Sequence, residues 1–174
     1  MNDLQSKLDQ IRSNESWLEK IKRYIPGYDG YVNRDNSREL DTLLRSGLAE
    51  RLEENKTKLK NTVSLLSDNG DLFSVSGIDK IDKKNETVIA KLRSASRGYS
   101  GAFDVIKIKE DKLNQLYQFD GNLLENADAL CSKFDELEKK AAAKEDLKNY
   151  ITGISDSLDE FLKKFTEREE LLKQ

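Results

Sequence analysis

The sequence predicts an all-α fold, an elongated antiparallel bundle of four or five long helices with coiled-coil character. Apolar and charged residues each make up 36% of the 174 residues, a balance that is typical of helices with one apolar stripe and wide solvated faces. One proline and nine glycines leave little turn chemistry for many short strands. Apolar residues recur at spacings of three and four along most of the chain. We therefore expect a single helical-bundle domain over residues 1–174.

The first part of the chain contains two predicted helices. The apolar stripe predicts a first helix over residues 3–25, and this helix should end before Pro26, because proline disfavours helical geometry at the preceding residue. The second helix should start near residue 33 or 35, both good N-caps, and end at the turn signal of residues 68–70. Such a helix of about 35 residues would be roughly 50 Å long.

Residues 70–77 are ambiguous. They could be the first turns of the third helix, or an extended connection that packs Leu72, Phe73 and Val75 over the end of the bundle. The third helix itself is clear from Ile78 onward, where apolar residues alternate by three and four in a heptad-like seam.

The second part of the chain predicts a long helix from about Glu110 and a final amphipathic segment. Residues 139–148 are strong helix formers with a thin apolar stripe. We expect them to be helical and to project beyond the bundle or to pack loosely. Gly153 is a candidate kink, after which a loosely packed C-terminal helix would follow.

Two glycine-tyrosine segments stand out from the helical pattern. Residues 24–45 hold the only proline and three of the six tyrosines, and residues 97–104 repeat their Gly-Tyr-x-Gly core, again followed closely by an aromatic residue. Counting antiparallel helices that are joined by short turns puts both segments at the same end of the bundle. Tyrosines, glycines and arginines would then gather at this aromatic end.

Two interpretations of the aromatic end stay open. It could be a binding surface, with aromatic side chains for contact and arginines for an anionic or acidic partner. It could instead be a packed cap in which glycines let two loops cross and tyrosines bury their rings, and aromatic residues near turns more often have this structural role. The residues proposed for binding are Tyr28, Tyr31, Arg34, Arg38, Arg97, Tyr99 and Phe103.

Asp120 is predicted to face the bundle interior, because it follows apolar residues at helical spacing. A carboxylate in that position needs a positive or hydrogen-bond-donating partner. Its candidate partners are Arg38, Arg93 and Arg97, and Asp41 and Asp104 would share the network. We interpret this set as a structural ion-pair network that fixes loop register, with a catalytic carboxylate pair as the alternative.

Asn55 and Asn85 each fall on the apolar stripe of a predicted helix. Buried asparagines commonly set register or partner choice in helical assemblies, at some cost in stability. The alternative is that the seam drifts and both side chains are solvated.

The chain contains no histidine and one cysteine, Cys131. Within one chain this excludes a Ser-His-Asp triad, a Cys-His dyad and a histidine-ligated metal, so we expect no cofactor and no metal. A lone cysteine cannot form an internal disulfide, and the N-terminal residues lack the apolar run of a signal peptide. The cytoplasm is therefore the expected location.

Charge and hydropathy also bear on possible partners. The net charge is −3, with 30 basic and 33 acidic residues mixed along the chain, which argues against nucleic-acid binding. No apolar run approaches the roughly 20 residues that span a bilayer, and the acidic excess of the last segment disfavours anionic lipid. We expect neither nucleic-acid binding nor membrane insertion.

The leading functional hypothesis is a non-enzymatic interaction or assembly module. It would bind itself or another protein through helix seams and the aromatic end. A first alternative is a site for an anionic small molecule or a phospho-group at the arginine-lined end. A second alternative is an enzyme that uses carboxylates and tyrosines.

Overall fold

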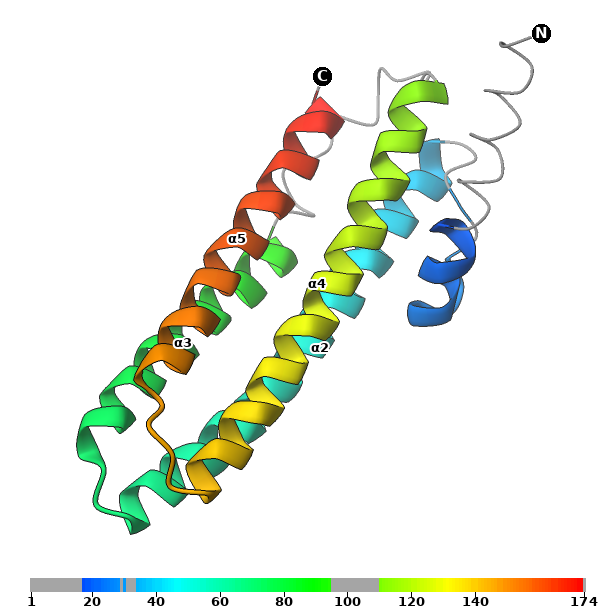
Figure 1. Ribbon diagram of the computed structural model, residues 1–174. Coiled ribbons are helices and arrows are strands. Elements are labelled where there is room, and N and C mark those ends of the chain that lie inside the picture. Colours follow the sequence, from blue (N-terminus) through cyan, green and yellow to red (C-terminus); the bar gives the residue numbers. More distant parts are fainter. Residues whose placement is uncertain (1–16, 29, 31–33, 95–109, 174) are drawn as a thin grey trace, which may run out of the picture.

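The structure is a computed structural model that describes residues 17–28, 30, 34–94 and 110–173. It contains four long helices, α2 (Arg34–Asp68), α3 (Leu72–Ser94), α4 (Glu110–Ala142) and α5 (Lys148–Lys173) (Figure 1). Residues 17–24 add a short helical stretch, and no strand occurs in these ranges. The predicted all-α bundle is confirmed.

Consecutive helices run in opposite directions, as predicted, but they do not follow one another around the bundle. Helix α2 packs against α3 and α4, and α5 packs against the same two helices. The diagonal pairs are therefore α2 with α5 and α3 with α4, while the neighbours α2 and α4, like α3 and α5, run parallel (Figure 1). Helix α2 begins, α3 ends and α4 begins at one end, which we call the loop end; the other is the turn end.

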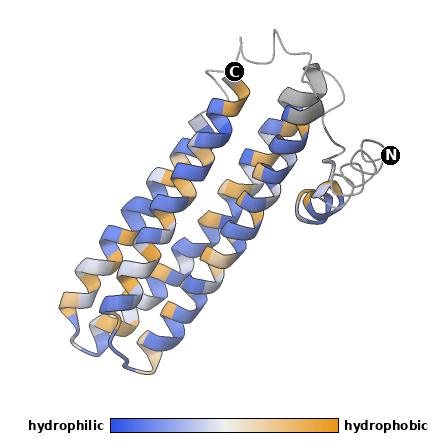
Figure 2. Ribbon diagram, turned by 45° about the horizontal axis from the view of Figure 1, so that its top comes forward, coloured by the Kyte–Doolittle hydropathy of each residue, from blue (hydrophilic) through white to orange (hydrophobic). Residues whose placement is uncertain are grey.

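Apolar stripes at helical spacing hold the bundle together. Figure 2 shows apolar residues following each helix in stripes between polar ones. The fully buried members include Leu44, Leu48 and Leu52 of α2, Leu123 and Phe134 of α4, and Ile154, Phe161 and Phe165 of α5. Burial of each such side chain contributes about 1.5–3 kcal/mol, so the core accounts for most of the stabilisation.

The first hairpin turn at the turn end has the geometry of a Schellman motif. Gly70 adopts a φ of 76°, which glycine tolerates without a steric penalty. The backbone N–H of Asp71 donates to Leu66 O (2.9 Å) and that of Gly70 donates to Ser67 O (3.1 Å). Asp71 then caps α3 by accepting the Ser74 N–H at 3.0 Å.

This cap settles the conformation of residues 70–77. Helix α3 begins at Leu72, so the first-turn alternative is correct and the extended connection is wrong. Leu72 and Phe73 do not pack over the end of the bundle, since they are 72% and 83% exposed.

The second hairpin turn corrects the prediction for residues 139–148. Helix α4 ends at Ala142, and Lys144 takes the left-handed position with a φ of 59°. The N–H of Glu145 donates to Lys140 O and that of Lys144 donates to Ala141 O, both at 3.1 Å. The expected projecting or loosely packed helical segment is therefore wrong.

Helix α5 begins at Lys148 and continues through Gly153, whose position lies within the helix. Asp146 accepts the Lys148 N–H at 3.0 Å, and Leu147 just before the helix is buried. Ile154 and Leu158 are also buried, so α5 is packed into the bundle from its first turns.

The segment around residues 17–28 lies against α2 and α4 at two glycines. A Cβ at Gly121 of α4 would lie 2.1 Å from Trp17 Cε3, and one at Gly47 of α2 would lie 3.2 Å from Ile25 Cγ1. Gly121 therefore permits a close approach that any larger residue would obstruct, whereas a Cβ at Gly47 would require Ile25 to shift by a few tenths of an ångström. This contact brings Tyr28 into the loop end of the bundle.

Candidate functional site

A buried cluster of charged residues occupies the core near the loop end. We call it the ion network, and its members are Tyr28, Asp41, Arg45, Asp120, Arg168 and Glu169. All six are at most 4% exposed. Charged side chains are rarely this deeply buried unless they are paired.

Arg168 of α5 is the centre of the ion network. Its Nε donates to Asp120 Oδ1 of α4, and its Nη1 donates to Asp41 Oδ1 of α2, both at 2.5 Å. The Tyr28 hydroxyl donates to the second oxygen of Asp120 at 2.8 Å. One guanidinium therefore ties three helices together, and the residue 25–28 segment is fastened to the same carboxylate.

Arg45 extends the ion network across the bundle diagonal. Its Nε donates to Asp41 Oδ2 at 2.7 Å and its Nη1 donates to Glu169 Oε1 at 3.3 Å. Its guanidinium also lies 4.8 Å from the centre of the Phe165 ring, within cation–π range. Lys91 of α3 reaches Glu169 at 3.7 Å, so all four long helices contribute a charge.

Among the described residues, the charges of the ion network balance once the neighbouring Lys91 is included. Three carboxylates face Arg45, Arg168 and the half-exposed Lys91. Burial alone would raise the pKa of Asp41, but the neighbouring Arg168 and Arg45 guanidiniums lower that pKa below its usual value. An ionised, fully paired carboxylate is a poor proton acceptor, so the geometry favours a structural ion network over a catalytic pair.

Asp120 has a cationic partner beyond those proposed from the sequence, of which Arg97 and the side chain of Arg38 lie outside the described residues. Asp120 is fully buried, on the predicted inward face, but its described cationic partner is Arg168. Arg93, one of the candidates, pairs with Glu53 at 2.9 Å near the surface. A signal for Arg168 existed in the sequence, because it continues the spacing of three and four set by Phe161, Phe165 and Leu172.

The other predicted site residues divide into two groups. Tyr28 is fully buried, so its ring is not accessible to a partner. The side chains of Arg34 and Arg38 in α2, and all of Tyr31, Arg97, Tyr99, Phe103 and Asp104, lie outside the described residues. The predicted approach of the two glycine-tyrosine segments also falls there.

Asn55 and Asn85 are both fully buried, so the solvated alternative is wrong. Asn85 Nδ2 donates to Leu52 O across the α2–α3 contact at 2.9 Å. This bond favours one register of α3 against α2, which is the role that buried asparagines have in helical assemblies.

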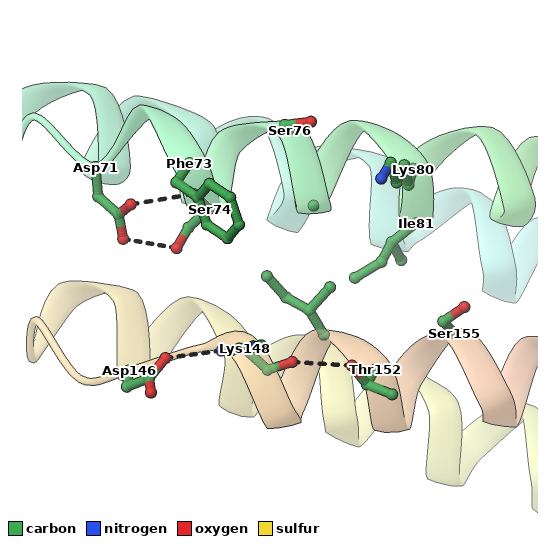
Figure 3. Close-up of a pocket in the computed structure, with 12 residues that line it drawn as sticks. Asp71, Phe73, Ser74, Ser76, Lys80, Ile81, Asp146, Lys148, Thr152 and Ser155 are labelled. Atoms are coloured by element: carbon green, nitrogen blue, oxygen red, sulfur yellow. Dashed lines mark hydrogen bonds between the residues drawn. The ribbon is translucent and has the colours of Figure 1, made fainter.

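A groove opens between α3 and α5 at the turn end, which is the end of the bundle opposite the ion network. It has a volume of about 530 Å³. Figure 3 shows Phe73, Ser74 and Ile81 of α3 on one side and Thr152 and Ser155 of α5 on the other. Gly77 lets Ile151 of α5 lie directly against α3, since a Cβ there would be 3.0 Å from Ile151 Cδ1.

The groove adjoins the most exposed large apolar side chains of the described chain. Leu72 and Phe73 are neighbours in the first turn of α3, and Phe73 lines the groove itself. We call Leu72, Phe73, Gly77, Ile81 and Ile151 together the tip patch. Adjacent exposed apolar residues beside a hollow are typical of contact surfaces.

The described ranges give no sign of a metal centre or of a membrane span. They hold no group of three or more residues of the His, Cys, Asp and Glu types that could bind a metal ion. None of the helices in these ranges is both long and apolar enough to cross a bilayer.

Fold and site together define an all-α helical bundle with an ionic core at one end and an apolar hollow at the other. No protein-family model matches the sequence, and no solved structure is significantly similar to the chain.

Proposed function

We propose that this protein is a non-enzymatic helical interaction module that binds protein through the tip patch. The observation that carries the proposal is the exposure of Leu72 (72%) and Phe73 (83%) beside the groove between α3 and α5. Leaving two large apolar side chains in water forgoes about 1.5–3 kcal/mol for each of them. A partner that covered them would recover that free energy.

The chemistry of the buried charges supports a non-enzymatic role. The carboxylates of the ion network accept hydrogen bonds from arginines, since Arg168 donates to Asp120 of α4 and Arg45 donates to Glu169 of α5. The sequence has no histidine that could act as a general base near neutral pH. These features suit a rigid scaffold that presents a surface.

The same pairing weakens the case for an anionic ligand at the loop end. Arg45, Arg93 and Arg168 already pair with carboxylates. A phosphate would have to displace those carboxylates to gain the same contacts. A partner at the tip patch would not have to displace carboxylates from arginines, and we therefore propose protein binding at the tip patch.

Site-directed photocross-linking tests the proposal. A benzoylphenylalanine at position 72 should form adducts with a polypeptide in a lysate of the source cells, and excess unlabelled protein should suppress them. The same probe at position 90, an exposed residue of α3 outside the tip patch, is the matched control. Equal labelling at both positions, or none at position 72, would refute protein binding at the tip patch.

A further inference from the structure

The tip patch contains both a projection and a hollow. Leu72 and Phe73 project from the first turn of α3, while Gly77, Ile81 and Ile151 lie in the groove beside them. When both features belong to one patch, two copies related by a two-fold axis can each insert the projection into the hollow of the other. Such an isologous contact closes on itself and leaves neither apolar feature exposed.

The charged residues around the groove also suit contact with a second copy, because negative and positive charges are equal in number there. Asp71 and Asp146 contribute two negative charges, and Lys80 and Lys148 contribute two positive ones. A strongly acidic or strongly basic partner would meet like charges on half of this rim. A two-fold related copy instead lets lysines of one chain face carboxylates of the other.

The carboxylates of the rim are held in place before any contact forms. Asp71 accepts the Ser74 N–H and hydroxyl at 3.0 and 2.6 Å, and Asp146 accepts the Lys148 N–H at 3.0 Å. Figure 3 shows both carboxylates at the ends of the two helices that line the groove. Preorganised groups lose little conformational entropy on binding.

We infer that the partner of the tip patch is a second copy of this chain, bound by a two-fold contact between two tip patches. This inference rests on the proposed function, because it identifies the partner of the same surface. The contact area is confined to the turn end, so the dimer is of the small, reversible class rather than an obligate one.

Analytical ultracentrifugation of the full chain tests the inference. Between about 1 µM and 1 mM, a range that covers the dissociation constants of weak dimers, the mass should rise from 19.9 kDa toward twice that value. Leu72→Ser and Phe73→Ser should each weaken dimerisation at least about tenfold, with unchanged circular dichroism because both residues are exposed. Lys83→Ser, at an exposed α3 position outside the groove, is the control and should dimerise like the parent.

Disulfide trapping locates the interface independently. In a Cys131→Ser background, Ser76→Cys at the groove should form an intermolecular disulfide under mild oxidation, and Ser64→Cys, exposed on α2, should not. A strict monomer at every concentration, a dimer that is indifferent to Leu72→Ser and Phe73→Ser, or equal trapping at positions 76 and 64 would each overturn the inference. A monomer that still forms adducts with a different polypeptide from position 72 would overturn self-association and leave the proposed function standing.

Discussion

At the scale of single residues, Arg168 is the side chain on which the loop end depends. It is fully buried and holds carboxylates from two other helices. Replacing an entire buried ion network by apolar residues is often neutral, whereas removing one partner leaves a buried charge without compensation. We therefore expect the network to contribute more to the specificity of the helix arrangement than to net stability.

We predict that Arg168→Met lowers the free energy of unfolding by about 3–5 kcal/mol. The buried carboxylates of Asp41 and Asp120 would lose their shared cation. Urea denaturation followed by circular dichroism measures the loss. Arg93→Met is the control, because Arg93 is half-exposed and such pairs contribute at most about 1 kcal/mol; equal losses in the two variants would contradict the prediction.

The lowered pKa of Asp41 predicts that the stability of the protein depends on pH. Its native pKa is lowered from 3.8 by Arg168 and Arg45 against the opposing effect of burial. Its contribution is therefore complete above the unfolded pKa and is lost as the pH falls through the lower native pKa. The free energy of unfolding should drop on acidification below about pH 4.

The variant Asp41→Asn isolates this effect. It should be less stable than the parent at neutral pH, because Arg45 and Arg168 lose a charged partner. The difference in stability should narrow as both proteins are titrated below about pH 4. A difference that stays constant across the acid range would show that Asp41 does not titrate in this way.

At the scale of elements, the close approach of the residue 17–24 helix to α4 depends on a missing side chain. We predict that Gly121→Ala displaces Trp17, since the new Cβ would lie 2.1 Å from Trp17 Cε3. Fluorescence of Trp17, the only tryptophan, should shift to the red. The thermal midpoint should fall despite the better helix propensity of alanine.

Gly153→Ala is the matched control for this substitution. Gly153 lies inside α5, and a Cβ there meets no atom within 4 Å. The change should stabilise the protein by about 0.5–1 kcal/mol through helix propensity alone. If Gly121→Ala raised stability as much, the contact with Trp17 would not restrict that position.

The turn between α4 and α5 contains a residue in an unfavourable backbone conformation. Lys144 has a φ of 59° at the position where Schellman motifs usually carry glycine. We predict that Lys144→Gly stabilises the protein by about 0.5–1 kcal/mol, because glycine avoids the steric cost of that region. A fall in the thermal midpoint would indicate that the lysine side chain compensates for its backbone strain.

At the scale of the whole molecule, the two ends of the bundle differ in what they bury and expose. The loop end contains the ion network, whose Glu169 also pairs with Lys91 of α3, and the turn end carries the tip patch with its exposed Leu72 and Phe73. Loss of a buried charge at the loop end should therefore affect folding, while loss of the exposed Leu72 and Phe73 side chains should affect only association.

We predict that deletion of residues 165–174 abolishes cooperative unfolding. The deletion removes Phe165, Arg168, Glu169 and Leu172, all buried, and their combined loss approaches the roughly 5–15 kcal/mol by which domains are stable. Calorimetry should show no single transition. The double variant Leu72→Ser, Phe73→Ser should keep the single unfolding transition of the parent at low protein concentration. If that transition were lost, the tip patch would contribute to the stability of the monomer.

The helices themselves could be predicted because their signals are local. A residue spacing of three and four places apolar side chains on one face whatever the rest of the chain does, so the bounds of α2 agree with the prediction within a residue or two. The end of α4 was missed because a lysine occupies a position where glycine is the usual signal.

The sequence by itself determined where most of the described helices lie, the opposite directions of consecutive helices, and the burial of Asp120. Only the tertiary structure decided that α5 lies diagonally opposite α2, with Arg168 between Asp41 and Asp120. The physical reason is that amphipathic stripes specify which face of a helix is buried but not which neighbour covers it. That choice depends on the simultaneous packing of all the helices.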